Sequence, residues 1–207
     1  MDKSSLLQSL RKKNFPEKII NAFAEVPREN FISQSMKNLA YEDTPLPIGN
    51  NQTISQPYTI AVMLDLLELE KEQNILEVGS GSGYVLTLIS KITGEKGKVY
   101  GIEIIPELVE KSKSSTRNYK NVEIYNRDGN LGLKEKSPFQ RILISARTEK
   151  IPEELIKQLK ENGIIVAPIG NSYSQDLISY KKIKGKLKIQ KRIPGFVFVP
   201  LIGKEEK

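Results

Sequence analysis

The chain of 207 residues contains neither cysteine nor histidine. The lack of cysteine excludes disulfide bonds and thiol nucleophiles. The lack of both residues excludes serine–histidine triads, cysteine–histidine pairs and the usual zinc sites. We therefore expect no bound metal, and any chemistry has to proceed without the most common catalytic base.

Long apolar runs are missing as well. No stretch approaches the ~20 residues of a membrane-spanning helix, and Met1–Ser5 lack the charged and apolar regions of a signal peptide. A hydrophobic content of 38% and a charged content of 28% are ordinary for a globular protein. We expect a cytoplasmic protein without membrane contact, long enough to bury a core within one domain.

Positive charge is present in excess, and it is concentrated near the end of the chain. The formal net charge is +7, and seven lysines and arginines lie between Lys181 and Arg192. Segment 182–189 alternates lysine with mostly apolar residues, which predicts a strand with one apolar and one cationic face. The lysines either keep a solvated edge strand from aggregating or form a contact surface for RNA or acidic peptides.

The order of apolar patterns predicts an α/β fold. Short helices are expected at 4–12 and 16–24, then an ordered loop at 41–56 and a helix from Pro57 to about Leu69. From residue 74 strands and helices alternate, which predicts a doubly wound, mostly parallel sheet with helices on both faces. Its strands are expected at 74–78, 98–102, 121–125, 141–145 and 163–167, and its helices at 83–92, 106–117 and 152–161.

Antiparallel strands are expected to complete this sheet after residue 170, at 177–183, 186–193 and 196–202. We interpret 1–207 as a single domain in three parts. Residues 1–57 supply the N-terminal helices and a loop, 58–170 the α/β core, and 171–207 the C-terminal strands.

Residues 74–84 (NILEVGSGSGY) form the central motif, an apolar strand that runs into three glycines before a helix. Such a turn lets backbone N–H groups approach a ligand. A dinucleotide motif needs a glycine five places after Gly79, where Tyr84 stands. Glu77 would repel a pyrophosphate and attract an ammonium group. The pattern E-x-G-x-G-x-G is similar to the first motif of class I methyltransferases, whose cofactor is S-adenosylmethionine; the alternative is a tight turn without a ligand.

The next apolar run ends in a second carboxylate. Glu103 closes the strand at 98–102 and lies 24 positions after Gly79. A nucleoside ribose needs an acceptor for its hydroxyls at the tip of the second strand, and an acid about 20 residues after the glycine motif supplies one. The same charge suits the start of the helix that Pro106 opens. The two roles are compatible.

Further segments closely resemble the protein-L-isoaspartate O-methyltransferase family. They cover nearly all of the chain from residue 26 onward, in order and with similar spacing. The segments are 26–31 (VPRENF), 41–49 (YEDTPLPIG), 52–58 (QTISQPY), 76–84 (LEVGSGSGY), 127–129 (RDG), 138–139 (PF), 151–152 (IP), 168–170 (PIG) and 198–201 (FVPL). Thr53–Pro57 is the specific segment, because many methyltransferases share the glycine motif.

The resemblance implies a repair enzyme. The family transfers a methyl group from S-adenosylmethionine to the α-carboxylate of L-isoaspartyl residues in damaged proteins and releases S-adenosylhomocysteine. The ester then recloses to a succinimide that can open to normal aspartate. A carboxylate is already ionised at neutral pH, so the protein needs no strong base. It has to hold the reacting atoms in line and away from water.

The resemblance also implies roles for particular residues. It marks Ser55 as the active-site position, where a hydroxyl can orient the carboxylate; the alternative is that Ser55 caps the helix opened by Pro57. Asp128 and Gly129 correspond to an adenine-contacting pair, or else form a simple turn. The residues expected at the substrate are Thr53, Ile54, Gln56 and Val199. Those expected at the cofactor are Glu77, Gly79, Ser80, Gly81, Gly83, Glu103, Ile104, Asp128 and Gly129.

Three positions depart from the family pattern. Gln140 stands where an acid is frequent, Arg147 where small residues are usual, and Ile202 where some relatives are polar. Two other functions stay open. One is an RNA methyltransferase of the same fold, although the basic strands offer only Tyr180 for stacking and no nucleic-acid partner is expected. The other is a non-catalytic module that binds S-adenosylmethionine or damaged proteins.

Overall fold

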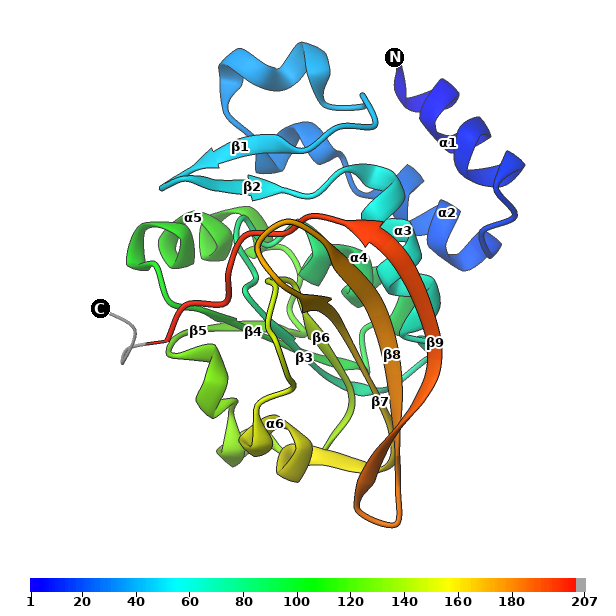
Figure 1. Ribbon diagram of the computed structural model, residues 1–207. Helices are drawn as coiled ribbons and strands as arrows, with labels where there is room; N and C mark the ends of the chain where they lie inside the picture. The colour runs from blue at the N-terminus through cyan, green and yellow to red at the C-terminus, as the bar shows by residue number, and fades with distance from the viewer. Residues whose placement is uncertain (204–207) are drawn as a thin grey trace.

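The computed structural model describes residues 1–203 and contains a seven-stranded sheet in the order β5-β4-β3-β6-β7-β8-β9 (Figure 1). The strands β3 to β7 run parallel, and β8 and β9 are antiparallel. The doubly wound, mostly parallel sheet with an antiparallel end is therefore confirmed. The strands are β3 (Asn74–Val78), β4 (Lys98–Glu103), β5 (Val122–Asn126), β6 (Phe139–Ile144), β7 (Leu159–Gly170), β8 (Gln175–Ile183) and β9 (Lys186–Phe196).

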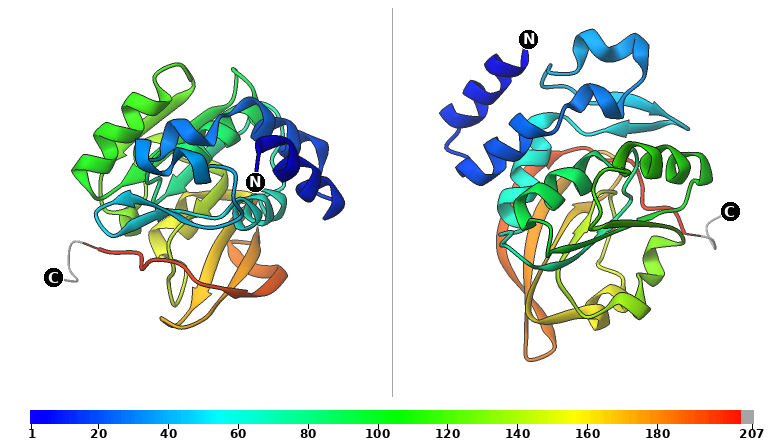
Figure 2. Two further views of the ribbon diagram at one scale, coloured as in Figure 1. Left: turned by 90° about the horizontal axis from the view of Figure 1, so that it is seen from above. Right: turned by 180° about the vertical axis from the view of Figure 1, so that it is seen from behind.

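Helices cover both faces of the sheet, as Figures 1 and 2 show. Successive side chains of a strand point to opposite faces. On β3, Ile75 packs into the cluster shared with α1 to α5, whereas Leu76 and Val78 pack into the cluster shared with α6. The helices are α1 (Lys3–Lys12), α2 (Glu17–Glu25), α3 (Pro57–Leu66), α4 (Tyr84–Thr93), α5 (Pro106–Thr116) and α6 (Glu153–Gln158), with short 3₁₀ helices η1 (Arg28–Phe31), η2 (Gln34–Leu39), η3 (Gly129–Leu131) and η4 (Lys134–Lys136). Most bounds agree with the sequence prediction within a few residues.

The segment 41–56, expected as a loop without regular structure, contains a β-hairpin. Strands β1 (Leu46–Gly49) and β2 (Gln52–Ile54) pair antiparallel. Asn50 and Asn51 form the turn with φ of 51° and 56°. Asparagine tolerates this left-handed region, and a two-residue turn with both φ values positive matches the twist of a hairpin. The expectation of a loop alone was therefore wrong.

The helix expected at 152–161 ends at Gln158, and its last residues already belong to β7. Leu159 is extended and buried, and it pairs with Phe139 of β6. The Nζ of Lys182 donates to the carbonyls of Ile156 and Leu159, both at 2.7 Å. A charged donor on these terminal carbonyls, together with burial of Leu159, favours the early end of the helix.

The third antiparallel strand expected at 196–202 does not form. After Phe196 the chain crosses the carboxyl ends of the parallel strands (Figure 1), where Pro200 forms an isolated parallel bridge with Arg147. The N–H of Arg147 donates to Val199 O at 2.8 Å, and Leu201 N donates to Arg147 O at 2.9 Å. Because proline has no N–H to donate, Pro200 is unsuited to a regular strand. We call residues 197–202 the crossing segment.

The basic strand β9 lies at one edge of the sheet, and its predicted apolar face is only partly buried. Ile189 is 55% exposed, so the prediction that one face of this strand is apolar and buried was wrong here. In β8, by contrast, Leu177 and Ile178 are fully buried. The reason is visible in Figure 1, where the tip of the β8–β9 hairpin extends beyond the helices that cover the sheet.

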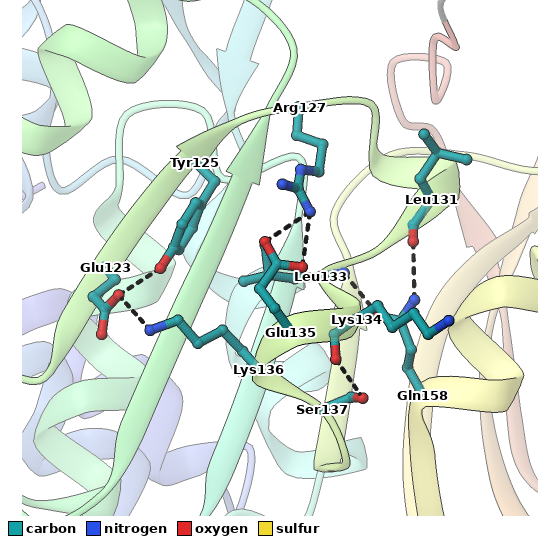
Figure 3. A network of polar contacts seen from close by, with 10 residues as sticks. All are labelled: Glu123, Tyr125, Arg127, Leu131, Leu133, Lys134, Glu135, Lys136, Ser137 and Gln158. Atoms are coloured by element: carbon teal, nitrogen blue, oxygen red, sulfur yellow. Dashed lines mark hydrogen bonds and ion pairs between the residues drawn. The ribbon is translucent and has the colours of Figure 1, made fainter.

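A polar network fixes the connection between β5 and β6 (Figure 3). Arg127 donates to Glu135 at 3.0 Å. The side-chain amide of Gln158 donates to Leu131 O at 2.9 Å and accepts from Leu133 N at 2.7 Å. This connection carries Gly129 to the carboxyl ends of the strands, where a pocket lies.

No helix within residues 1–203 is long and apolar enough to cross a bilayer. The division of the chain into three parts of one domain stays a prediction. Residues 204–207, at the end of its third part, lie outside the described residues.

Candidate active site

A pocket lies at the carboxyl ends of β3 and β4, where open α/β sheets bind their ligands. Residues of the β1–β2 hairpin and of the crossing segment contribute to its walls. Five of the residues expected at the cofactor line this pocket, namely Gly79, Gly81, Glu103, Ile104 and Gly129. It is completed by Ile48, Gln52 and Thr53 of the hairpin, Val78, Ile102, Ile105, Ser145 and Ala146 of the strand ends, and Val199, Pro200, Leu201 and Ile202 of the crossing segment. We call it the cofactor pocket.

The glycine turn shapes the floor of this pocket. Gly79 has φ of +81°, a conformation that side-chain-bearing residues rarely adopt. A Cβ at this position would have its nearest neighbour, Ala146, at 3.8 Å, so there is space above the backbone. Gly83 has a different task, since it precedes α4 and a Cβ there would meet Thr116 of α5 at 2.8 Å. The structure therefore places Gly83 outside the cofactor pocket, in a helix contact.

Glu103 is held rigidly at the pocket. Its side chain is buried, its Oε2 accepts from Gly81 N at 2.9 Å, and its Oε1 accepts from Ile105 N at 3.0 Å. Each carboxylate oxygen can accept more than one hydrogen bond. The carboxylate thus fits a ribose hydroxyl pair while also lying at the start of α5.

Glu77 is the most buried carboxylate of the site, with a relative exposure of 1%. Its Oε1 accepts from Ser145 Oγ at 2.7 Å, and its Oε2 has no hydrogen-bond partner within residues 1–203. Burial raises the pKa of Glu77 to about 8; the hydrogen bond from Ser145 lowers it, and the charge of Glu103 raises it further. An unpaired buried oxygen is costly, so this group fits a ligand ammonium such as that of S-adenosylmethionine.

A second pocket adjoins the first and contains Ser55. Four residues expected at the active site line it: Thr53, Ser55, Gln56 and Val199. A third pocket brings Ile54 and Ser55 next to Glu77, Gly79, Ser80 and Gly81. Thr53 and Ser145 line all three pockets. Ser55 therefore lies beside the cofactor pocket.

Ser55 does not cap α3. The N-cap position is Gln56, without a side-chain cap. The N–H of Tyr58 in the first turn donates instead to Asp43 Oδ1 at 2.8 Å. The hydroxyl of Ser55 has no partner in the described part of the chain, so the capping interpretation was wrong and the hydroxyl is available to a substrate.

Asp128 lines none of the three pockets. It precedes η3, where its Oδ1 accepts from the backbone N–H of Asn130 at 2.8 Å. Its neighbour Gly129 lines the cofactor pocket, and a Cβ on Gly129 would meet Val78 at 2.4 Å. The turn interpretation of this pair is thus correct in its geometry, and contact with a cofactor stays a prediction.

Arg28 is a residue of the site that the sequence did not mark for a role. Its side chain is completely buried, and its guanidinium donates to the carbonyls of Ala40 at 2.8 Å, Thr44 at 3.1 Å and Ser55 at 3.0 Å. A longer contact of 3.4 Å reaches Glu42 O. Arg28 therefore holds the segment that carries Ser55. Its place in the family-like motif VPRENF was the only sequence feature that could have pointed to this role.

The three departures from the family pattern occupy different places. Gln140 accepts from Asn74 N at 2.8 Å, at the amino ends of β3 and β6 and away from the pockets. Arg147 holds the crossing segment through its backbone. Ile202 lines the cofactor pocket and is 39% exposed.

A doubly wound sheet, a glycine turn after β3 and an acid at the tip of β4 define the class: a Rossmann-like, S-adenosylmethionine-dependent methyltransferase. The sequence places the chain more narrowly. It belongs to the protein-L-isoaspartate(D-aspartate) O-methyltransferase family, whose profile matches residues 1–206.

Individual relatives agree with this membership. The chain is 40% identical over 201 residues to the protein-L-isoaspartate O-methyltransferase of Methanococcoides burtonii. The match covers 96% of this chain and 98% of the relative. The chain is 44% identical over 207 residues to the Methanothrix thermoacetophila enzyme of the same name, covering 99% and 96%.

Two solved structures are similar throughout the fold. A protein-L-isoaspartate O-methyltransferase matches with a TM-score of 0.89 at 30% identity over 98% of this chain, which spans 66% of that protein's length. A Plasmodium falciparum protein assigned to the same activity, in complex with S-adenosyl-L-homocysteine, matches with a TM-score of 0.83 at 26% identity, covering 98% and 99%.

Proposed function

We propose that this protein transfers a methyl group from S-adenosylmethionine to the α-carboxylate of L-isoaspartyl residues in damaged proteins. The carrying observation is that the cofactor pocket and the pocket of Ser55 share Thr53 and Ser145. A methyl donor in one pocket and a carboxylate in the other would meet at these shared walls. Membership in the family supports this substrate class.

When bound, the cofactor supplies an activated methyl group on its sulfonium. The residues of this chain then have to bind, orient and exclude water. Glu77 offers a carboxylate to the ammonium group, and Glu103 accepts from the ribose hydroxyls. Ser55 donates its hydroxyl to the substrate carboxylate, which is already ionised near neutral pH. The hairpin and the crossing segment line the pocket and would limit the access of water to the reacting atoms.

Methyl transfer from labelled S-adenosylmethionine tests this function directly. A peptide containing isoaspartate should be methylated, the same peptide with normal aspartate should not, and Ser55→Ala should lower turnover while S-adenosylhomocysteine still binds. Labelling of RNA but not of the isoaspartyl peptide would support the RNA methyltransferase. Cofactor binding without transfer to either would support the non-catalytic module. The cytoplasmic location stays a prediction.

A further inference from the structure

Ser145 connects the cofactor pocket to the pocket of Ser55. It follows the last residue of β6, and its N–H donates to Val78 O at 2.8 Å, which continues the pairing with β3. Its hydroxyl donates to Glu77 Oε1 at 2.7 Å. The strand pairing fixes the backbone of Ser145 next to that of β3, and from this position the hydroxyl reaches Glu77.

The carboxylate that Ser145 contacts has little other support. Glu77 lies on the central strand β3, is 1% exposed, and has one oxygen without a hydrogen-bond partner within residues 1–203. From β4 it faces the carboxylate of Glu103, whose negative charge disfavours a second charge nearby. From β6 it faces Ser145, which does not titrate in the accessible range. The hydroxyl of Ser145 is thus the neighbouring group that favours an ionised and oriented Glu77.

We propose that Ser145 is a positioning residue for the cofactor: its hydroxyl binds one oxygen of Glu77 and leaves the other oxygen to the ammonium group of S-adenosylmethionine. This inference rests on the cofactor site proposed above. It gives a role to a polar side chain that lines all three pockets. It also predicts that Ser145 affects only ligands that carry the amino-acid moiety.

Calorimetry with two ligands separates positioning from general pocket structure. S-adenosylhomocysteine carries the ammonium group, and 5′-methylthioadenosine has the same nucleoside and thioether without it. Ser145→Ala should weaken binding of S-adenosylhomocysteine about 10-fold, the scale of one hydrogen bond to a charged group, and leave binding of 5′-methylthioadenosine within about twofold. Ser145→Thr keeps a hydroxyl and should restore most of the loss.

A double-mutant cycle with Glu77→Gln completes the test. If Ser145 acts through Glu77, Ser145→Ala should cause no further loss of S-adenosylhomocysteine affinity in the Glu77→Gln background. Equal weakening of both ligands, unchanged affinity in Ser145→Ala, or additive losses in the cycle would each overturn the proposal. Failure of the wild-type protein to bind S-adenosylhomocysteine would overturn the cofactor site itself. Unchanged affinity of the variants would instead overturn only the role of Ser145.

Discussion

Arg28 offers the most demanding test of how the site is held together. Its guanidinium binds carbonyls at three separate points of the segment 40–55, including that of Ser55. Replacement by methionine keeps an apolar side chain of similar length but removes every donor. We expect Arg28→Met to destabilise the folded state by about 3–5 kcal/mol, from hydrogen-bond losses of the scale known for buried groups.

That magnitude is a balance of opposing effects. Each of the three carbonyls left without its donor costs about 1–3 kcal/mol. Against this, the burial that lowers the pKa of Arg28 is itself unfavourable, and its Nε has no partner within residues 1–203. Water that enters the loosened segment and binds the freed carbonyls further reduces the loss of stability. For a chain of this length, about 3–5 kcal/mol corresponds to a decrease in melting temperature of roughly 6–20 °C.

Thermal and urea unfolding measure this loss, with Arg28→Lys as the matched variant. Lysine keeps the charge but lacks the planar fork that spans several carbonyls, so its stability should lie between wild type and Arg28→Met. Below the melting temperature, both variants should lose turnover more than cofactor affinity, because no carbonyl bound by Arg28 belongs to a residue lining the cofactor pocket. A loss within about 0.5 kcal/mol, the size of an ordinary surface change, or an equal loss of cofactor affinity would refute the reasoning.

Three other predictions follow from the site. Asp43→Ala should lower stability by about 1 kcal/mol through loss of the α3 cap without changing turnover of the folded fraction. Ser55→Ala and Ser55→Gly, by contrast, should lower turnover without changing urea unfolding. Full activity of Ser55→Gly would contradict the catalytic role. Gly79→Val should abolish binding of S-adenosylhomocysteine, and Glu103→Ala should weaken it by about 1–3 kcal/mol; unchanged calorimetric affinity in both would remove the cofactor assignment. Because burial raises the pKa of Glu77 to about 8, the folded protein holds an extra proton between the unfolded pKa and this value, so stability from this group is lost as pH rises through about 8. Without cofactor, Glu77→Gln should lose less stability than wild type between pH 6 and pH 9, and equal pH dependence in chemical unfolding would contradict this.

The sequence predicted those parts of the molecule that depend on local patterns. Apolar runs and glycines located β3, β4 and the turn between β3 and α4, because period and turn chemistry act over a few residues. The cap of α3 could not be found this way. A serine two residues before Pro57 satisfies the local rule, yet the N–H of Tyr58 donates to Asp43, 15 residues earlier in the chain. A tertiary contact therefore determines which side chain caps α3.

The same reason explains the other misses. Arg28 was visible within a motif, but its burial depends on carbonyls up to 27 residues away. The crossing segment has strand-like composition, but Pro200 offers no N–H for a ladder, and pairing with Arg147 directs the segment across the strand ends instead. Ser145 gave one weak signal, a polar residue at the end of a predicted parallel strand, which is where such folds place their ligands.

The crossing segment leads to the last prediction, which concerns how a damaged peptide is held. A repair enzyme meets many sequences, so recognition has to use the backbone groups that all peptides share. The inward groups of the segment are occupied, since Val199 O and Leu201 N bind Arg147. The carbonyls of Phe198 and Pro200 accept no hydrogen bond from the described residues, and Phe198 lines the pocket of Ser55.

We therefore expect an extended peptide to donate its N–H groups to these carbonyls, as an added strand does at a sheet edge. Varied side chains around the isoaspartate should be tolerated, whereas N-methylation of a flanking amide should raise KM about 10-fold, the loss of one buried hydrogen bond. The exposed lysines of β9 should add a preference for acidic peptides that fades as salt screens it. The control is a peptide N-methylated far from the isoaspartate. Equal kcat/KM for the flanking-methylated and unmodified peptides would show that the backbone of the crossing segment does not hold the substrate.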